Sequence, residues 1–373
     1  MRENNLQGKR RKKKHKRSEN GILAGSILLC IVTLASITIC LVMVFQNRAA
    51  QLQNVEVMSE LETARQEMET SYTQDEVDQM IQEAVTQTKE QTSQEVSGEL
   101  LGKLKEMMQS GDGATEMLRY FFPEEIVVAD AGQYYFFPIQ EGLKKHTYDP
   151  QGFQMDGDQV MHYYENGERV SHKGIDVSKY QEEINWKKVA DDEVEYAFIR
   201  LGIRGYTEGE ILVDDNFQAN IKGALENGID VGVYFFTQAT SEAEAEEEAA
   251  FVIDSIEQYD VSYPVVIDIE AVSNNNARTK DLTKEERTKY CITFCEKIKE
   301  AGYTPMIYGN LKSFMLMLDM EQLEEYDKWF AYYDDRMYFP YAHKIWQYTS
   351  TGRVSGIAGD VDLNISFEEL KDE

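Results

Sequence analysis

The chain has 373 residues, which is enough for two folded modules and their connectors. Hydrophobic residues make up 42% of it and aromatic residues 11%, so the chain has the material for a sizeable core and wholesale disorder is excluded. The formal net charge is -29, but the first 46 residues carry nine bases and two acids, whereas the remainder carries 29 bases and 65 acids. The part of the chain after residue 46 is so acidic that it repels phosphate backbones, which argues against nucleic acid as a partner.

The first candidate element is an uncharged run from Gly21 to Phe45, rich in Ile, Leu and Val. As a helix it would measure roughly 37 Å, enough to cross a bilayer core of about 30 Å. The basic run Lys9–Arg17 precedes it, which predicts a cytoplasmic N-terminus and an extracellular C-terminal part of a single-pass cell-membrane protein. A cleaved signal peptide is the alternative, but the run is long for one and lacks a clear small-x-small cleavage site.

A polar, Gln- and Glu-rich stretch without proline, residues 47–110, follows the apolar run. Its apolar residues recur at spacings of three and four, as at Val57, Leu61 and Ala64, which predicts a helical stalk. The stripe is interrupted, so two interpretations stay open: a coiled coil that joins copies of the chain into a homo-oligomer, and a simple spacer.

Residues 111–172 are rich in aromatic and turn residues, and Asn166–Gly167 predicts a β-hairpin. We expect a small β-rich segment here and assign no chemistry to it. The domain boundaries that follow are 1–20 for a basic cytoplasmic tail, 21–46 for a transmembrane helix, 47–110 for the stalk, 111–172 for the β-rich segment and 173–373 for a C-terminal domain.

In that last domain, short apolar runs alternate with helical patterns, which predicts a parallel sheet, open or closed. The candidate strands are 174–178, 196–202, 229–236, 264–270, 304–309, 328–333 and 344–349, and the candidate helices are 215–227, 241–259 and 283–302. Capping boxes are expected at Ser241–Glu244 and Thr283–Glu286. No glycine-rich phosphate loop follows any strand, so no nucleotide cofactor is expected.

The strand Pro264–Glu270 carries two acids on one face, because side chains alternate along a strand. Asp268 and Glu270 would lie about 6.6 Å apart along the backbone, at the carboxyl end where a barrel has its active site. Neighbouring buried acids push their pKa values apart, and cleavage of a glycosidic bond needs one protonated and one charged carboxyl group. The alternative is a strand end whose acids are solvated or cap the next helix.

Further acids and aromatic residues accompany the other predicted strands. Asp176 lies in GIDVSKYQ and Asp362 in GDVDLN, near the end of the sequence. Aromatic rings suit the apolar faces of sugars, although each of these residues fits a hydrophobic core equally well. The candidate sugar platforms are Tyr234, Phe236, Trp329, Tyr332, Trp346 and Tyr348.

The segments GIDVSKYQ, GVYFF, VVIDIE, WFAYY, WQYT and GDVDLN stand in the order and spacing of family 25 glycoside hydrolases, the family 25 lysozymes, which residues 174–367 resemble. The resemblance implies an irregular, TIM-like (β/α) barrel. It implies cleavage of the β-1,4 bond between N-acetylmuramic acid and N-acetylglucosamine in peptidoglycan, without a cofactor or a metal. Phe235 stands where many relatives have histidine, and Tyr332 where many have glutamine.

Carried over by position, the resemblance makes Glu270 the general acid. Asp268 would stabilise positive charge or orient the 2-acetamido group, with Asp176 and Asp362 as supporting acids. The substrate-binding residues implied at the matching positions are Tyr234, Phe236, Trp329, Tyr332, Trp346 and Gln347. Both a substrate-assisted route and a carboxylate nucleophile remain open.

Three functions are compatible with these patterns. The first is a muramidase tethered to the membrane and facing the cell wall, and the second is a non-catalytic glycan-binding scaffold oligomerised through its stalk. The third is a wall hydrolase that cuts another bond. A zinc amidase lacks a paired-histidine motif in this sequence, and Cys291 and Cys295 lie in an apolar helical pattern that indicates burial rather than peptidase chemistry.

Overall fold

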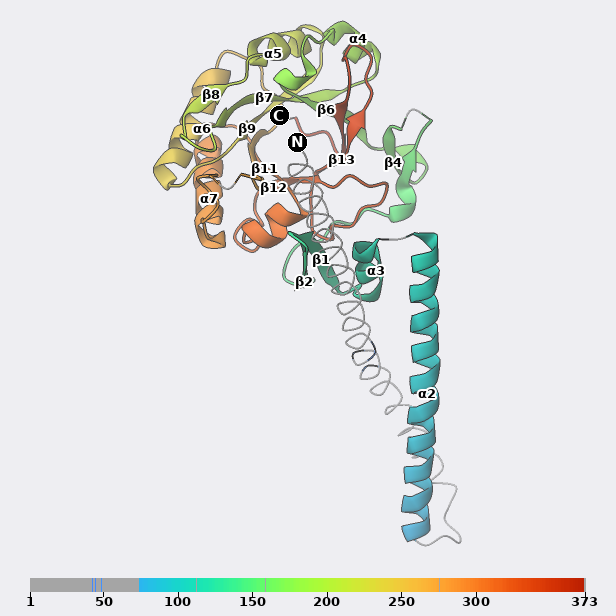
Figure 1. Ribbon diagram of the computed structural model, residues 1–373. Coiled ribbons are helices and arrows are strands. Elements are labelled where there is room, and N and C mark those ends of the chain that lie inside the picture. The colour runs from blue at the N-terminus through green and yellow to red at the C-terminus, as the bar shows by residue number, and fades with distance from the viewer. Residues whose placement is uncertain are drawn as a thin grey trace, which may run out of the picture. The chain divides into compact units, whose positions relative to one another are not determined.

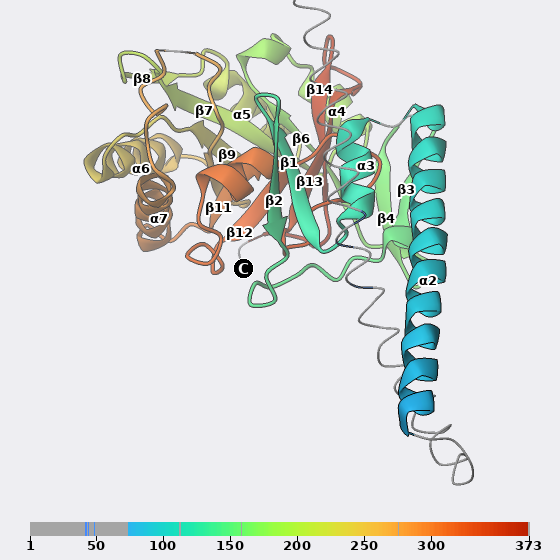
Figure 2. The same cartoon turned by 60° about the horizontal axis from the view of Figure 1, so that its bottom comes forward.

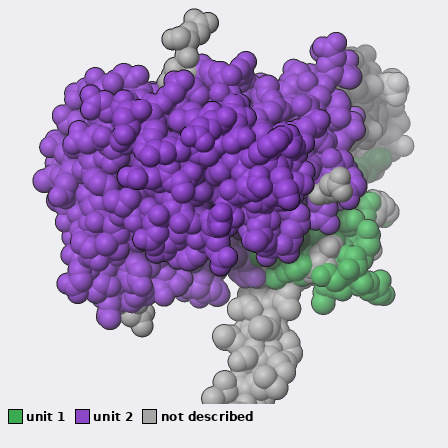
Figure 3. All heavy atoms as spheres, turned by 90° about the horizontal axis from the view of Figure 1, so that it is seen from above, with its two compact units in different colours: residues 1–123 green, residues 124–373 purple. Residues whose placement is uncertain are grey.

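The computed structural model describes residues 42, 44, 48, 74–111, 113–157, 159–274 and 276–371. The chain divides into two compact units, residues 1–123 and 124–373, which Figure 3 shows in different colours. The predicted membrane-spanning segment lies outside the described residues, apart from Val42 and Val44. In the part of the chain that is described, no helix is long and apolar enough to cross a membrane.

The first unit contains two described helices, the long α2 (Gln74–Ser110) and the short α3 (Ala114–Phe121) (Figure 1). Apart from Arg48, the predicted stalk falls on described residues only from Gln74 onward, where the chain is helical. Four buried apolar residues of the two helices form a small cluster of their own: Leu100, Met107, Met117 and Phe121.

The second unit is built on a closed eight-stranded β-barrel, so the mixed α/β barrel expected from the sequence is confirmed. Seven strands run parallel, and β14 runs antiparallel between the first strand, β6, and the seventh, β13. The eight strands in chain order are β6 (His172–Val177), β7 (Tyr196–Arg204), β9 (Asp230–Phe236), β10 (Val265–Asp268), β11 (Pro305–Asn310), β12 (Asp327–Ala331), β13 (Ile345–Gly352) and β14 (Val361–Ser366). A short strand, β8 (Ile211–Val213), extends β7 as an antiparallel hairpin.

Helices follow only the first four parallel strands, which makes the barrel irregular. They are α4 (Trp186–Asp191), α5 (Phe217–Glu226), α6 (Glu242–Ile256) and α7 (Lys284–Glu300), of which α5, α6 and α7 lie on the outside of the barrel in Figure 1. A π-helical turn, η3 (Ser313–Met317), replaces a full helix after β11. Cys291 and Cys295 are buried in α7, as predicted.

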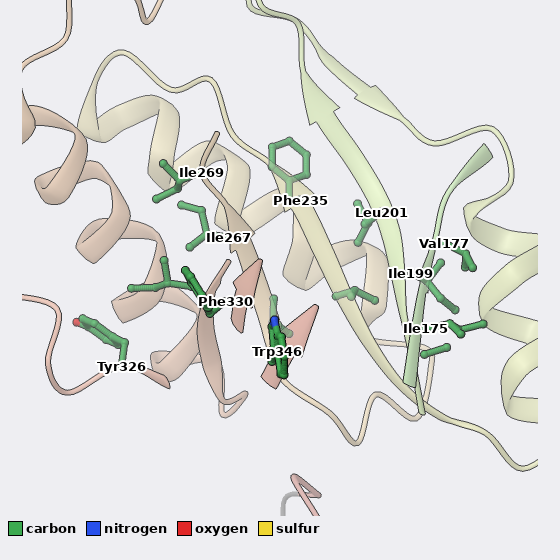
Figure 4. Close-up of a cluster of buried hydrophobic side chains, with 14 of the residues drawn as sticks. Ile175, Val177, Ile199, Leu201, Phe235, Ile267, Ile269, Tyr326, Phe330 and Trp346 are labelled. Carbon is green, nitrogen blue, oxygen red and sulfur yellow. The ribbon is translucent and has the colours of Figure 1, made fainter. Parts of the chain in front are cut away.

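Side chains that alternate along the strands form two separate cores. Val265, Ile267 and Ile269 of β10 and its extension belong to the large outer core between strands and helices, in which Figure 4 labels Ile267 and Ile269. Val266 packs inside the barrel. The interior core also contains Tyr196, Phe198, Tyr263, Met306, Tyr308, Trp329, Ala331, Ile345 and Leu370. The alternation predicted for the β10 segment is therefore confirmed, and it directs Asp268 into the barrel.

Residues 124–171 pack in the same unit as the barrel. The hairpin of β1 (Glu125–Asp130) and β2 (Gln133–Pro138) is visible in Figure 2, and a second small sheet consists of β3 (Phe153–Met155), β4 (Met161–Glu165) and β5 (Glu168–Arg169). The turn between β4 and β5 places Asn166 at φ 53° and Gly167 at φ 86°, as a two-residue hairpin turn requires. The predicted hairpin is confirmed.

The two expected capping boxes have different outcomes. Thr283 and Glu286 cap α7 reciprocally, as predicted. At α6, Ser241 accepts the Glu244 backbone N–H, but the Glu244 carboxylate bonds Thr240 and Arg278 instead of returning to Ser241. The predicted hydrogen bond from the Ser241 backbone N–H to the Glu244 carboxylate is therefore wrong. The Arg278 guanidinium is nearby and is the stronger partner for a carboxylate.

Candidate active site

A pocket of about 460 Å³ lies where the parallel strands end. All eight strands of the barrel contribute residues to it, and those from β6, β9, β10, β12, β13 and β14 include residues that were predicted. Its lining is Asp176, Tyr180, Arg200, Ile203, Tyr206, Tyr234, Phe236, Asp268, Glu270, Ala271, Val272, Tyr308, Trp329, Tyr333, Gln347 and Asp362. A larger, more open hollow of about 1140 Å³ beside it shares only Tyr180 with the pocket and holds none of the four candidate acids.

Asp268 and Glu270 enter this pocket from β10 and its extension. Asp268 is 5% exposed, and its Oδ1 has no hydrogen-bond partner among the described residues. Glu270 is half-buried. The backbone around them is fixed, because the Asp268 carbonyl accepts the Thr237 N–H and the Ile269 N–H donates to the Tyr308 carbonyl. A carboxyl group without a hydrogen-bond donor in a buried site favours its protonated form.

Asp176 and Asp362 face each other across the antiparallel pair of β6 and β14. Asp176 is buried, and its Oδ2 accepts hydrogen bonds of 2.8 Å from Gln347 Nε2 and 2.8 Å from Asn364 Nδ2. The Gln347 Oε1 atom in turn accepts from the Tyr308 hydroxyl at 2.8 Å, which fixes the orientation of the amide. Two amide donors favour the charged form of Asp176.

The four acids therefore titrate differently. Burial raises the pKa of Asp176 to about 6, against the opposing effect of its two amide donors. Burial raises the pKa of Asp362 to about 8, and the charge of Asp176 adds to this effect. Burial also raises the pKa of Asp268 well above its usual value, as do the charges of Glu270 and Asp176, and burial with the charge of Asp176 raises the pKa of Glu270. At neutral pH the pocket can thus hold both a carboxylate and protonated acids, which is what glycosidic cleavage needs.

Arg200 is the only basic residue among the described residues that line the pocket. Its guanidinium bonds Asp214 Oδ2 through Nε at 2.8 Å and Nη2 at 2.7 Å. The ring of Tyr180 lies over this guanidinium, with 5.0 Å between Cζ and the ring centroid. Burial and the acidic neighbours raise the pKa of Asp268, and the positive charge of Arg200 opposes this shift.

The structure brings most of the predicted site residues together. The four acids line one pocket with Tyr234, Phe236, Trp329 and Gln347. Trp329 is 1% exposed and donates its indole N–H to Asn364 Oδ1, so it forms part of the pocket floor rather than an open platform.

Trp346, Tyr332 and Tyr348 do not line the pocket, which corrects the predicted sugar contacts. Trp346 is fully buried in the outer core, where Figure 4 shows it, and its indole N–H donates to the Tyr332 carbonyl. Tyr332 packs on the outer core beside Phe330. Tyr348 belongs to the same core, and its hydroxyl accepts a hydrogen bond from the Met161 N–H. The physical reason is strand parity, because Trp346 and Tyr348 point outward while Gln347 between them points inward.

Several residues in or next to the pocket were missed in the sequence, although a signal existed for three of them: Arg200 and Tyr308 in the lining, and Asn364, which donates to Asp176. Arg200 follows Tyr196 and Phe198 at steps of two on β7, and both point into the barrel. Asn364 shares the inward face of β14 with Asp362, and Tyr308 shares that of β11 with Met306. The exposed rim tyrosines, Tyr180, Tyr206 and Tyr333, lie in loops and had no periodic signal. Over the described ranges, no group of three or more His, Cys, Asp and Glu side chains is arranged to hold a metal ion.

A barrel with a carboxylate-lined pocket at the ends of its strands is typical of glycoside hydrolases. Residues 175–357 match the family model of the glycosyl hydrolases family 25. The chain is 33% identical to YegX of Escherichia coli K12, described as uncharacterized, over 213 residues that cover 53% of this chain and 71% of YegX. This chain therefore belongs to family 25 of the glycosyl hydrolases, and its barrel is a glycoside hydrolase domain.

Two further relatives are named for lytic enzymes. Lysozyme M1 of Streptomyces globisporus is 27% identical over 52% of this chain and 66% of its own length. The solved structure of the autolysin LytC from Streptococcus pneumoniae has 27% identity and a TM-score of 0.49, and the similarity covers 64% of this chain. The chain spans 57% of the LytC chain, which is just over half of its length.

Proposed function

We propose that the protein is a muramidase that cleaves the β-1,4 bond between N-acetylmuramic acid and N-acetylglucosamine in peptidoglycan. The observation that carries this proposal is the gathering of Asp268 and Glu270 with Asp176 and Asp362 in one pocket at the strand ends. The name of the relative Lysozyme M1 supports the choice of substrate.

In this proposal Glu270 is the general acid. Its pKa is raised by burial and by the charge of Asp176, so it keeps a proton to give to the leaving glycosidic oxygen. The bond between the anomeric carbon and that oxygen breaks as the proton is transferred, and positive charge develops on the sugar ring. Asp268 stabilises this charge or orients the 2-acetamido group, and water completes the hydrolysis.

Asp176 is the group that holds protons on its neighbours. It keeps its negative charge because two amides donate to it, and that charge contributes to the raised pKa of Asp268, Glu270 and Asp362. The tyrosines of the lining supply apolar surface on which sugar rings pack.

The test replaces Glu270 by Gln, which keeps the shape of the side chain and removes its acidic proton. We expect Glu270→Gln to lower the release of reducing ends from purified peptidoglycan by on the order of 100-fold or more, as for loss of a general acid. Mass analysis of the products should show wild-type cleavage on the reducing side of N-acetylmuramic acid, with the stem peptides intact.

The matched control is Glu226→Gln, at an exposed position of α5 that does not line the pocket. It should retain wild-type activity. Wild-type rates from folded Glu270→Gln protein would remove the assignment of the general acid, and cleavage of peptide bonds would remove the muramidase proposal itself.

We also infer that the enzyme acts from the outer face of the cell membrane, anchored by Gly21–Phe45. The support is the uncharged run behind the basic segment Lys9–Arg17. Protease treatment of intact cells tests this: the C-terminal domain should be digested while an epitope tag on the N-terminus is protected. Release of the full-length protein by a high-salt wash would contradict a membrane-spanning anchor.

A further inference from the structure

The pocket contains an arrangement that the proposed chemistry has not yet used. Arg200 on β7 is buried to 15% exposure of its side chain among acids. Its partner, Asp214, has a side chain with 0% exposure and does not line the pocket. The Arg200 guanidinium therefore lies between the buried Asp214 carboxylate, which is outside the pocket lining, and the acidic pocket that Arg200 itself lines.

Asp214 is held more tightly than an ordinary ion-pair partner. Besides the two Arg200 nitrogens, its Oδ2 accepts the Lys179 backbone N–H at 3.1 Å, and its Oδ1 accepts the Asn216 backbone N–H at 3.0 Å. Four donors hold this buried carboxylate in one geometry. Since Oδ2 takes two bonds from the same guanidinium, Asp214 fixes where the positive charge lies.

The loop over the cation is fixed by the same carboxylate. Lys179 begins the turn η2 (Lys179–Gln181), and the next residue, Tyr180, covers the guanidinium with its ring. Tyr180 itself lies at the pocket rim and is 74% exposed. Shielding one face of the guanidinium from water strengthens its electrostatic effect on the acids in the pocket.

We propose that Arg200, fixed by Asp214 and covered by Tyr180, is a positioning residue that provides the counter-charge needed to ionise the carboxylate which faces the developing positive charge of the sugar. This inference rests on the proposed muramidase function. Asp268 is the carboxylate in question, because it lines the same pocket and, among the described residues, no hydrogen-bond donor to its Oδ1 stabilises the charged form in place of a counter-charge.

The charged and titratable groups around Arg200 come from most of the strands that border the pocket and from the segments that follow them. They are Asp214 and Tyr180 in direct contact, Asp176 on β6, Tyr206 after β7, Tyr234 on β9, Asp268 and Glu270 on and beyond β10, Tyr308 on β11, Tyr333 after β12 and Asp362 on β14. All the pocket acids carry the same sign, so without Arg200 each ionisation would oppose the next. In support, burial and neighbouring acids raise the pKa of both Asp268 and Tyr234, and the charge of Arg200 opposes both shifts.

The experiment measures kcat/KM against pH on purified peptidoglycan for the full chain and three variants. Arg200→Gln removes the charge but keeps a donor for Asp214, so the acidic limb of the profile should move to higher pH by on the order of one unit, a tenfold loss on that limb. Arg200→Lys keeps the charge and should stay near the wild-type limb. Asp214→Asn removes the opposing charge behind Arg200, so its limb should move to lower pH.

The acidic limbs of Arg200→Gln and Asp214→Asn are expected to shift in opposite directions. This distinguishes a charge effect from a loss of packing, because a loss of packing would leave the pH position of the acidic limb unchanged. Lys179→Met is the matched control, because the Lys179 ammonium pairs with the exposed Asp215 and its backbone N–H is unaltered. It should leave the acidic limb in place.

Unchanged limbs in active Arg200→Gln and Asp214→Asn proteins, or limbs that move in the same direction, would overturn the inference. If Arg200→Gln does not fold, Asp214→Asn is the deciding variant. An acidic limb of Asp214→Asn that does not move to lower pH would then overturn the inference. A wild-type protein that releases no reducing ends would instead contradict the proposed muramidase function, so the two failures are distinguishable.

Discussion

Residues of one type behave differently in this pocket because their partners differ. Asp176 and Asp268 are both buried aspartates that point into the same barrel. Asp176 receives two amide hydrogen bonds, whereas Asp268 Oδ1 receives none within the described residues. The two amides therefore decide which of the acids gives up its proton first, and burial alone does not.

A second buried titratable residue lies outside the pocket. His343 is 3% exposed among the rings of Phe330, Phe339 and Phe367, and its Nδ1 contacts the Tyr341 carbonyl. Burial lowers the pKa of His343 to about 3. The unfolded chain would take up this proton near pH 6.5, so His343 contributes stability that is fully present above pH 6.5 and is lost as the pH falls toward 3.

We predict that replacing His343 by Asn makes stability less sensitive to acid. Between pH 6.5 and pH 4.5 the wild type should lose on the order of 2 kcal/mol more free energy of unfolding than His343→Asn. Urea denaturation at the two pH values measures this difference. Phe339→Leu is the control, because it removes packing next to His343 without removing a titrating group. The free energy of unfolding that it loses relative to the wild type should be equal at the two pH values. Equal acid sensitivity of the wild type and His343→Asn would refute the prediction.

Among the strands, β9 shows how the interior of the barrel is filled. Gly232 on β9 leaves space for the Phe198 ring of β7, and a Cβ at this position would lie 2.3 Å from that ring and 2.8 Å from the Pro264 carbonyl oxygen. Both neighbours are constrained, because Phe198 stacks on Trp329 with centroids 4.5 Å apart and Pro264 precedes β10.

We therefore expect Gly232→Ala to destabilise the barrel by about 1–3 kcal/mol or more, the usual effect of overpacking. The matched control is Gly142→Ala, where an added Cβ meets nothing within 4 Å. Thermal unfolding of both variants is the measurement. An unchanged melting temperature for Gly232→Ala would show that the strands can separate at this point without cost.

The strands that alternate plainly were predictable, and the others were not. All seven candidate strands of the C-terminal domain occur as β6, β7, β9, β10, β11, β12 and β13. The eighth, β14, was missed because Asp362 and Asn364 occupy its inward face, so it lacks the apolar alternation of a buried strand. The short α4 and β8 were missed because two turns of helix or three residues of strand give no clear period.

The same limit applies to the site. Asp268 and Glu270 could be placed because their strand is apolar at every other position. Trp346 was misplaced because parity in WQYT depends on the register with β12, which sequence does not determine. Asp214 follows the β8 hairpin, and its approach to Arg200 depends on tertiary structure alone.

At the scale of the whole molecule, the pocket and its supporting core belong to one unit. All pocket residues and the large outer core lie within residues 124–373, and this core includes Ile126, Val128, Met161 and Tyr163 from the small sheets. The segment between the first unit and the barrel is thus a part of the barrel's own core.

We predict that residues 124–373 alone fold cooperatively and hydrolyse purified peptidoglycan at the rate of the full chain. A shorter form that starts at Ser171 lacks Ile126, Val128, Met161 and Tyr163, each worth about 1.5–3 kcal/mol when buried, and should unfold at a markedly lower temperature. Circular dichroism melts and reducing-end release test both forms. Equal melting temperatures would contradict a structural role for residues 124–170.

The position of β14 has a consequence for how this enzyme acquires activity. The hydrogen bond from Asn364 to Asp176 joins residues 188 positions apart, and the one from Gln347 to Asp176 spans 171. Contacts this distant in sequence form late and slowly in folding, because a long loop must close before they are made. A refolding chain could therefore regain most of its helices while Asp176 still lacks both amide donors, and catalytic competence would return only with the final closure of the ring of strands.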